Sequence, residues 1–205
     1  MRVAYVDCFS GISGDMFLGA LVDAGLPPDE LRDALKLLPV DGYRLEIGPL
    51  TRQGVSGHAV RVRLDDPAGQ PTRHLSDVTA IIRAASLPPA VIVEACRVFQ
   101  KLAEAEAAVH GTSIEEVHFH EVGAVDAIVD VVGAVWGLQQ LGVERVYASS
   151  VPTGSGTVQT AHGLLPVPAP ATLALLAGVN APLRPSPATT ELATPTGAAL
   201  LATLA

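Results

Sequence analysis

The chain has 205 residues, of which 49% are hydrophobic and 4% aromatic, so we expect a sizeable core built mainly from alanine, leucine and valine. The formal net charge is −8 and the 13 Lys and Arg residues are scattered, which argues against nucleic acid or an anionic membrane as a partner. Cys8 and Cys96 form neither a CxxC pair nor a disulfide framework, and no apolar run is long enough for a membrane helix. We therefore expect a cytoplasmic protein without a signal peptide.

Strand-like and helix-like segments alternate and predict one α/β domain over residues 1–205, with a mixed β-sheet and flanking helices in two or three layers. Strands are expected near residues 3, 45, 60, 117 and 147, and the turn Arg52-Gln53-Gly54 predicts that the second and third form a hairpin. The chain stops inside an apolar helix, which suggests the N-terminal part of a longer protein. Helices are expected at residues 16–24, 29–38, 74–85, 88–109, 124–141, 171–176 and 198–204.

A glycine-rich loop, residues 8–15, follows the first predicted strand and leads into a helix. This layout aims backbone N–H groups at an anion, but the loop contains no lysine. Asp7 and Asp15 would repel a phosphate, and they fit a metal or a metal-bridged ligand better. The alternative is a tight turn in which Asp15 only caps the helix, and both interpretations stay open.

The central stretch, residues 117–130, has the sequence VHFHEVGAVDAIVD and concentrates two histidines and three acids beside an apolar helix. Asp126 and Asp130 share one helical face with three glycines, on a narrow stripe that a backbone or ligand can approach closely. A carboxylate in such apolar surroundings needs a cation, a metal or several donors. We expect Asp126 to touch metal, substrate or a ligating histidine, and Asp130 to anchor a neighbouring backbone or arginine. The alternative is a solvated turn followed by a salt-bridged helix.

A second glycine loop, residues 152–158, precedes a proline-rich run that ends near residue 170. Its composition predicts few ladder hydrogen bonds, so we expect residues 152–170 to be the most mobile segment and to close over a ligand as a lid. His162 either faces a ligand or is an ordinary loop histidine. Both glycine loops and the central stretch follow predicted strands, and we expect them to converge on one cleft, with residues 10–15 near the central stretch.

The sequence resembles the LarC family of nickel insertion proteins in segments spread over nearly the whole chain. These segments are DCFSGISGDMFLGAL, RHLSDV, VHFHEVGAVDAIVDVVG, GSGTV followed by AHGLLPVPAPAT, and ELATPTGAAL. The resemblance implies insertion of Ni²⁺ into pyridinium-3,5-bisthiocarboxylic acid mononucleotide with formation of a nickel–carbon bond and consumption of CTP. It also implies a further C-terminal domain that handles CTP with Mg²⁺ or Mn²⁺, and homo-oligomerisation is compatible with it. Residues 65–73 contain no histidine where family members often carry a His-rich loop, so no nickel storage is expected there.

These observations assign roles to particular residues. The predicted catalytic residues are His120, Glu121 and Asp126. The predicted metal ligands are His118, His120, Glu121, Asp7 and Asp15. The predicted substrate-binding residues are Ser10, Gly11, Gly14, Gly154, Ser155, Gly156 and His162. Three rival functions stay open: a non-catalytic nickel metallochaperone, a metal-dependent hydrolase, and a structural interaction domain.

Overall fold

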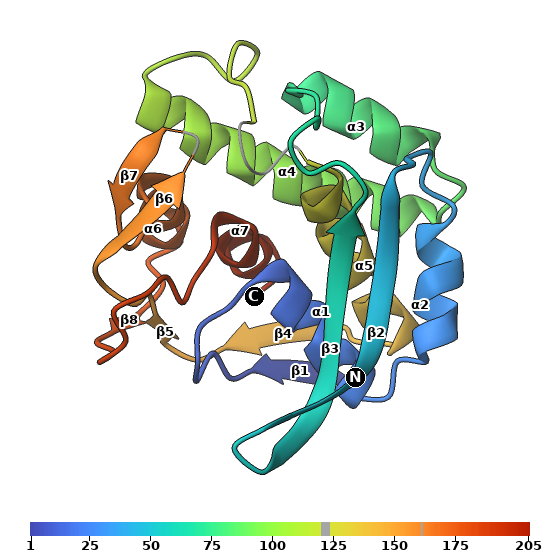
Figure 1. Cartoon of the computed structure of the whole chain (residues 1–205). Helices are drawn as coiled ribbons and strands as arrows, with labels where there is room; N and C mark the ends of the chain where they lie inside the picture. Colours follow the sequence, from blue (N-terminus) through green and yellow to red (C-terminus); the bar gives the residue numbers. More distant parts are fainter. Residues whose placement is uncertain (120–123, 161) are drawn as a thin grey trace.

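The apolar helix α5 (Val125–Gln140) lies at the centre of the fold. The computed structural model of the chain describes residues 1–119, 124–160 and 162–205. Within them, helix α5 is buried on nearly every side, and its only charged residues are Asp126 and Asp130. It packs against α1 (Gly14–Asp23), α2 (Pro28–Leu35), α4 (Pro89–His110) and α7 (Pro195–Leu204), as Figure 1 shows. Burial of its apolar surface stabilises the fold by about 25 cal/mol per Å².

The glycine stripe of α5 is where its neighbours approach most closely. A Cβ atom on Gly133 would lie 2.9 Å from Leu18 Cδ2 of α1, and one on Gly137 would lie 2.8 Å from Leu21 Cδ1. The predicted stripe of low bulk is confirmed, and it accommodates leucine side chains of α1 and α2 at its C-terminal end.

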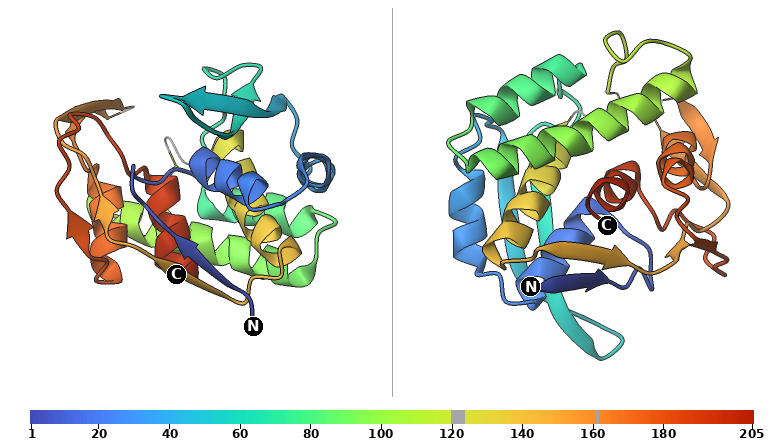
Figure 2. Two further views of the ribbon diagram at one scale, coloured as in Figure 1. Left: turned by 90° about the horizontal axis from the view of Figure 1, so that it is seen from below. Right: turned by 180° about the vertical axis from the view of Figure 1, so that it is seen from behind.

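Helix α4 crosses behind α5 and also covers α6 (Pro170–Gly178), α7 and α3 (Leu75–Ala84), as Figure 2 shows. Its buried residues recur at spacings of three and four, which is the pattern of an amphipathic helix. Pro89 occupies the start of α4, and Gly111, with φ 64°, ends it. These local signals explain why the helix bounds follow the sequence closely.

The α/β class with parallel and antiparallel strands is confirmed, but the strands expected in one mixed sheet pair two by two within the described residues. Strand β1 (Val3–Val6) runs parallel to β4 (Arg145–Ala148), and β5 (Val151–Pro152) runs parallel to β8 (Leu183–Arg184). The antiparallel pairs are β2 (Tyr43–Arg52) with β3 (Val55–Leu64), and β6 (Thr157–Thr160) with β7 (Gly163–Pro166).

The strand expected near residue 117 is wrong for the part of this stretch that the structure describes. Phe119 makes only an isolated bridge to Arg73, and the Phe119 N–H donates to the Arg73 carbonyl at 2.9 Å. The preceding residues turn instead, because the N–H groups of Glu116 and Val117 both donate to the Ser113 carbonyl.

The predicted hairpin of β2 and β3 is confirmed. Gln53 (φ 50°) and Gly54 (φ 81°) form its two-residue turn, because positive φ at both positions matches the twist of the strands. The hairpin lies over α1 and α5, and its turn projects beyond the helices (Figures 1 and 2). His58 fastens β3 to α1: its Nδ1 lies 2.7 Å from Asp23 Oδ1.

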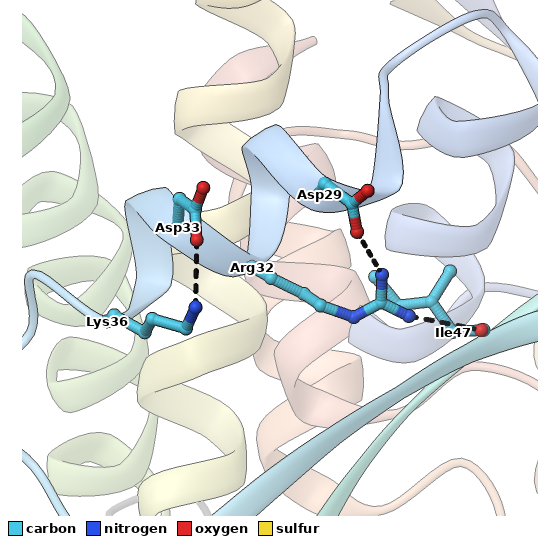
Figure 3. A network of polar contacts seen from close by, with 5 residues as sticks. All are labelled: Asp29, Arg32, Asp33, Lys36 and Ile47. Carbon is cyan, nitrogen blue, oxygen red and sulfur yellow. Dashed lines mark hydrogen bonds and ion pairs between the residues drawn. The ribbon is translucent and has the colours of Figure 1, made fainter.

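The opposite side of the hairpin is fastened to α2. Figure 3 shows Arg32 between Asp29 Oδ1, at 2.7 Å, and the Ile47 carbonyl of β2, at 3.3 Å. Lys36 pairs with Asp33 one turn further along the same helix. These exposed ion pairs each stabilise the fold only slightly.

Residues 152–170 are more regular than predicted. Strands β6 and β7 pair over four residue positions, so the expectation of few ladder hydrogen bonds is wrong. Pro166, Pro168 and Pro170 lie at the end of β7 and beyond it, and Pro152 is the last residue of β5, so none of them lies in the middle of a ladder. The mobility of this segment and its closure as a lid stay predictions. In the described ranges, no helix is both long enough and apolar enough to span a bilayer.

Candidate functional site

A cavity of about 310 Å³ opens where the first turns of α1, α5 and α7 meet strand β3. We call it the acidic cavity. Three helix N-termini at one place favour negative charge, because each presents unpaired N–H groups and the positive end of its dipole. Its lining residues are Ser13, Gly14, Asp15, Arg61, Val62, Arg63, Asp126, Asp130, Thr194 and Thr196.

The starts of α1 and α7 are held together by backbone contacts. Ile12 N–H donates to the Leu192 carbonyl at 2.8 Å, and Thr194 N–H donates to the Ile12 carbonyl at 3.0 Å. Ser13 and Thr194 are the two N-caps, accepting from backbone N–H groups of Met16 and Gly197. The cap of α1 is therefore Ser13. Asp15, in its first turn, accepts from the Met16 N–H at 2.8 Å and also lines the cavity.

Asp130 is the least satisfied side chain of the acidic cavity. The residue is half-buried, but its Oδ1 atom is closed to solvent and has no hydrogen-bond partner among the described residues. Burial, followed by the negative charges of Asp15 and Asp126, raises the pKa of Asp130 well above its usual value of 3.8. The expectation that Asp130 anchors a backbone or an arginine is therefore wrong. Its carboxyl group lies against Gly14, where an added Cβ would lie 2.6 Å from Asp130 Cβ.

Asp126 lies one turn closer to the start of α5. Its Oδ1 accepts from the Ala127 N–H at 2.9 Å, and burial is the main cause that raises the pKa of Asp126 above 3.8. Asp15, Asp126 and Asp130 therefore face one cavity, and the expected proximity of residues 10–15 to the central stretch is confirmed for these acids.

Two arginines from β3 lie at the same cavity. Arg63 Nε pairs with Glu46 Oε2 at 3.1 Å, whereas Arg61 makes no ion pair with any residue in the described ranges. Arg61 can thus offer a charged donor to an anionic ligand in the cavity.

The donor set of the acidic cavity consists of oxygen atoms from carboxylates and hydroxyls. Such donors suit Mg²⁺ or Mn²⁺, and they hold nickel less firmly than imidazole does. Across the described residues, no three His, Cys, Asp or Glu side chains are grouped so that they could hold a metal ion. A cation in the cavity would take part of its coordination from water or from a substrate, as a transfer site requires.

A second hollow, of about 210 Å³, lies on the other side of the α7 N-terminus and is lined in part by Pro195. We call it the histidine pocket. His110, at the end of α4, and His162, in the turn between β6 and β7, approach with their ring centroids 4.8 Å apart. Glu106 Oε2 lies 3.5 Å from His110 Nε2. His162, predicted as a substrate-binding residue, thus lies beside a histidine that the sequence shows only as a helix end.

The remaining predicted residues lie elsewhere. The ring of His118 packs against that of His74 in a tilted arrangement, with 4.2 Å between ring centroids, and does not line the described wall of the acidic cavity. Asp7 and Ser10 are exposed and also lie outside that wall. His120 and Glu121 lie outside the described residues, so their predicted roles stay predictions.

Gly11 of the first glycine loop and the second glycine loop meet the chain segment 188–192, whereas Ser13, Gly14 and Asp15 at the end of the first loop line the acidic cavity. A Cβ on Gly11 (φ +100°) would lie 2.6 Å from the Leu192 carbonyl carbon, and one on Gly154 (φ +85°) would overlap the Thr190 carbonyl oxygen. Ser155 Oγ donates to the Ala188 carbonyl at 2.9 Å, next to the exposed Gly156. These contacts explain why glycine occupies these positions. The predicted contact of these loops with substrate stays a prediction.

Sequence reasoning missed several residues of the two hollows. Arg61 and Arg63 alternate on β3 and are both exposed, so a shared outer face could have been predicted, but not the cavity beside it. Thr194 before Pro195 is an N-cap signature, and it could have placed a helix start there. No local signal joins His110 to His162.

The fold and the two hollows define an α/β protein with a cavity lined by three aspartates beside an imidazole-lined pocket. The family model described as "Nickel insertion protein" matches residues 4–205, so the chain belongs to that family. No solved structure shows a significant match to the chain.

Curated relatives match the whole chain. It is 58% identical over 206 residues to a Thermomicrobium roseum protein, covering 100% of this chain and 50% of that protein, whose name assigns it nickel insertion by inference. It is 54% identical over 201 residues to the pyridinium-3,5-bisthiocarboxylic acid mononucleotide nickel insertion protein of Desulfitobacterium hafniense strain DCB-2, covering 98% of this chain and 49% of that protein. The chain therefore spans about half the length of these relatives.

Proposed function

We propose that this chain is the part of a nickel chelatase that brings Ni²⁺ and pyridinium-3,5-bisthiocarboxylic acid mononucleotide together and forms the nickel–carbon bond of the nickel-pincer nucleotide. Support for the substrate comes from the name of the Desulfitobacterium hafniense relative, which is 54% identical. Nickel is a substrate here, since it leaves with the product.

The observation that carries the proposal is Asp130. A carboxyl oxygen that is closed to solvent, has no hydrogen-bond partner in the part of the chain that the structure describes, and lies near two further carboxylates is unfavourable unless a proton or a cation joins it. The open cavity around it has room for a ligand that brings its own donors. The two sulfur donors of the substrate would complete the coordination of nickel, and Arg61 is suited to its phosphate.

The proposed reaction replaces a C–H bond of the pyridinium ring by a Ni–C bond. The electron pair of the C–H bond passes to Ni²⁺, and the proton passes to a base. Asp126 is a candidate base, because burial raises its pKa toward the working pH. His120 and Glu121 remain proposed partners in this step and proposed metal ligands. His118, Asp7 and Asp15 remain proposed metal ligands only.

We further propose that turnover depends on CTP with Mg²⁺ or Mn²⁺, handled by the second half that the relatives possess, and that this chain alone is inactive. A cytoplasmic location and assembly into homo-oligomers belong to the same proposal.

The test is reconstitution with substrate, Ni²⁺ and Mg-CTP, with and without the second half of the Desulfitobacterium hafniense relative added in trans. Mass spectrometry should detect the nickel-containing nucleotide only when both halves are present, and Asp126→Asn should reduce its rate. Nickel binding without any product in the complete mixture would favour a metallochaperone. Phosphate release without nickel insertion would favour a hydrolase.

A further inference from the structure

The histidine pocket joins two imidazoles from distant parts of the chain. His110 belongs to the last turn of α4 and His162 to the turn of the β6–β7 hairpin, yet their ring centroids lie 4.8 Å apart with an interplanar angle of 50°. Both residues line the same hollow of about 210 Å³. Two imidazoles at this separation can each direct a ring nitrogen at one ion.

The carboxylate of Glu106 completes the pocket. Its side chain is 16% exposed, that of His110 is 30% exposed, and Glu106 Oε2 lies 3.5 Å from His110 Nε2. A carboxylate beside a ligating histidine orients the ring and raises its basicity. The β6–β7 hairpin brings His162 against His110, so a second imidazole from a distant part of the chain joins the Glu106–His110 helix pair.

We propose that His110 and His162 together bind one divalent nickel ion, with water filling its remaining positions, and that Glu106 is a positioning residue for His110. Imidazole suits nickel better than the oxygen donors of the acidic cavity do. A two-histidine site is of moderate affinity and open, so the ion can leave it. This is a second metal site, outside the acidic cavity, and it rests on the proposed function only for the choice of nickel.

The position of the histidine pocket relative to the acidic cavity gives this site a role. Pro195 lines the histidine pocket, while its neighbours Thr194 and Thr196 line the acidic cavity. The first turn of α7 is therefore a shared wall. Nickel held by the imidazole pair waits next to the place where the substrate is proposed to bind.

The experiment records imidazole NMR signals of the chain labelled with ¹⁵N-histidine during titration with nickel chloride, which broadens signals of bound rings through its unpaired electrons. Single His→Ala variants assign the signals. The signals of His110 and His162 should broaden together. They should do so at a lower nickel concentration than the signal of His58, which lies on the β2–β3 hairpin and pairs with Asp23 of α1. The change His162→Ala should raise the nickel concentration that broadens His110 by about 10-fold or more. The matched change His58→Ala should leave it unaltered.

Broadening of only one of the two rings, or of both only when His58 also broadens, would overturn the paired site. The wild-type titration does not depend on the folding of any variant. Formation of the nickel-containing nucleotide is measured separately, so product without paired broadening overturns this inference alone. Paired broadening without product leaves this inference standing and overturns the proposed function.

Discussion

Replacing Asp130 by Asn should stabilise the metal-free protein at neutral pH. The substitution keeps the shape of the side chain and removes the charge that burial, Asp15 and Asp126 make unfavourable. Since the native pKa of Asp130 lies well above its usual 3.8, the folded state binds more protons than the unfolded state between these two values. The free energy of unfolding of the wild type therefore falls as pH rises through that window, and the deficit persists at pH 7.

The size of the effect follows from the pKa shift. Each pKa unit corresponds to about 1.36 kcal/mol, so Asp130→Asn should raise the free energy of unfolding at pH 7 by on the order of 1 kcal/mol or more. Below pH 3.8 the wild-type carboxyl group is neutral in both states, and the difference should vanish. Saturating Ni²⁺ or Mg²⁺ should make the wild type more stable than Asp130→Asn. A cation at 100 times its Kd adds about 2.7 kcal/mol to the free energy of unfolding of the protein that binds it.

The assay is urea unfolding across this pH range, with and without the cation. Asp23→Asn is the matched control, because a hydrogen bond from His58 lowers the pKa of Asp23, and its contribution has the opposite sign. Asp23 stabilises the fold above its usual pKa of 3.8 and loses this contribution as pH falls through its native pKa. Equal destabilisation by both substitutions at pH 7 would refute the description of Asp130 as an uncompensated buried acid.

Three further predictions concern the same region. Gly14→Ala should lower Tm, because a Cβ 2.6 Å from Asp130 Cβ costs about 1–3 kcal/mol through overpacking, whereas the better helix propensity of alanine contributes about 1 kcal/mol. The control Gly178→Ala, whose Cβ would have no atom within 4 Å, should not lower Tm. In calorimetric titrations, His120→Ala should weaken nickel binding about 10-fold or more, and binding should weaken as pH falls through the imidazole range; unchanged affinity would move the metal site elsewhere. Amide hydrogens of residues 152–170 should exchange faster than those of α4 and slow down with ligand; equal protection without ligand would argue against a lid.

The helices could be predicted from the sequence because their signals are local. The proline at the start of α4 and the glycine after it fix the ends of that helix within a few residues, whereas Pro195 marks the true start of α7, which was expected only at residue 198. The convergence of Asp15 with Asp126 was expected because loops after strands gather at one edge, but no strand precedes the central stretch in the described residues. The glycine stripe of α5, which lets α1 approach closely, is the local feature that accounts for it.

The glycine loops show where local pattern is insufficient. Gly11 and Gly154 look like parts of an anion-binding loop, yet each makes room for a carbonyl group of residues 190–192, more than thirty residues away in the sequence. The same limit applies to His110 and His162, which meet only because the turn of the β6–β7 hairpin lies at the C-terminal end of α4. Contacts of this kind depend on the packing of whole elements.

The most direct test of where insertion takes place is diffraction at the nickel absorption edge from crystals soaked with Ni²⁺ and the mononucleotide substrate. The proposed function predicts an anomalous peak in the acidic cavity, within coordination distance of Asp126 or Asp130 and of the substrate's sulfur atoms. A second peak between His110 and His162 is compatible with this result. Nickel and substrate found together at any site that these aspartates do not reach would contradict the account.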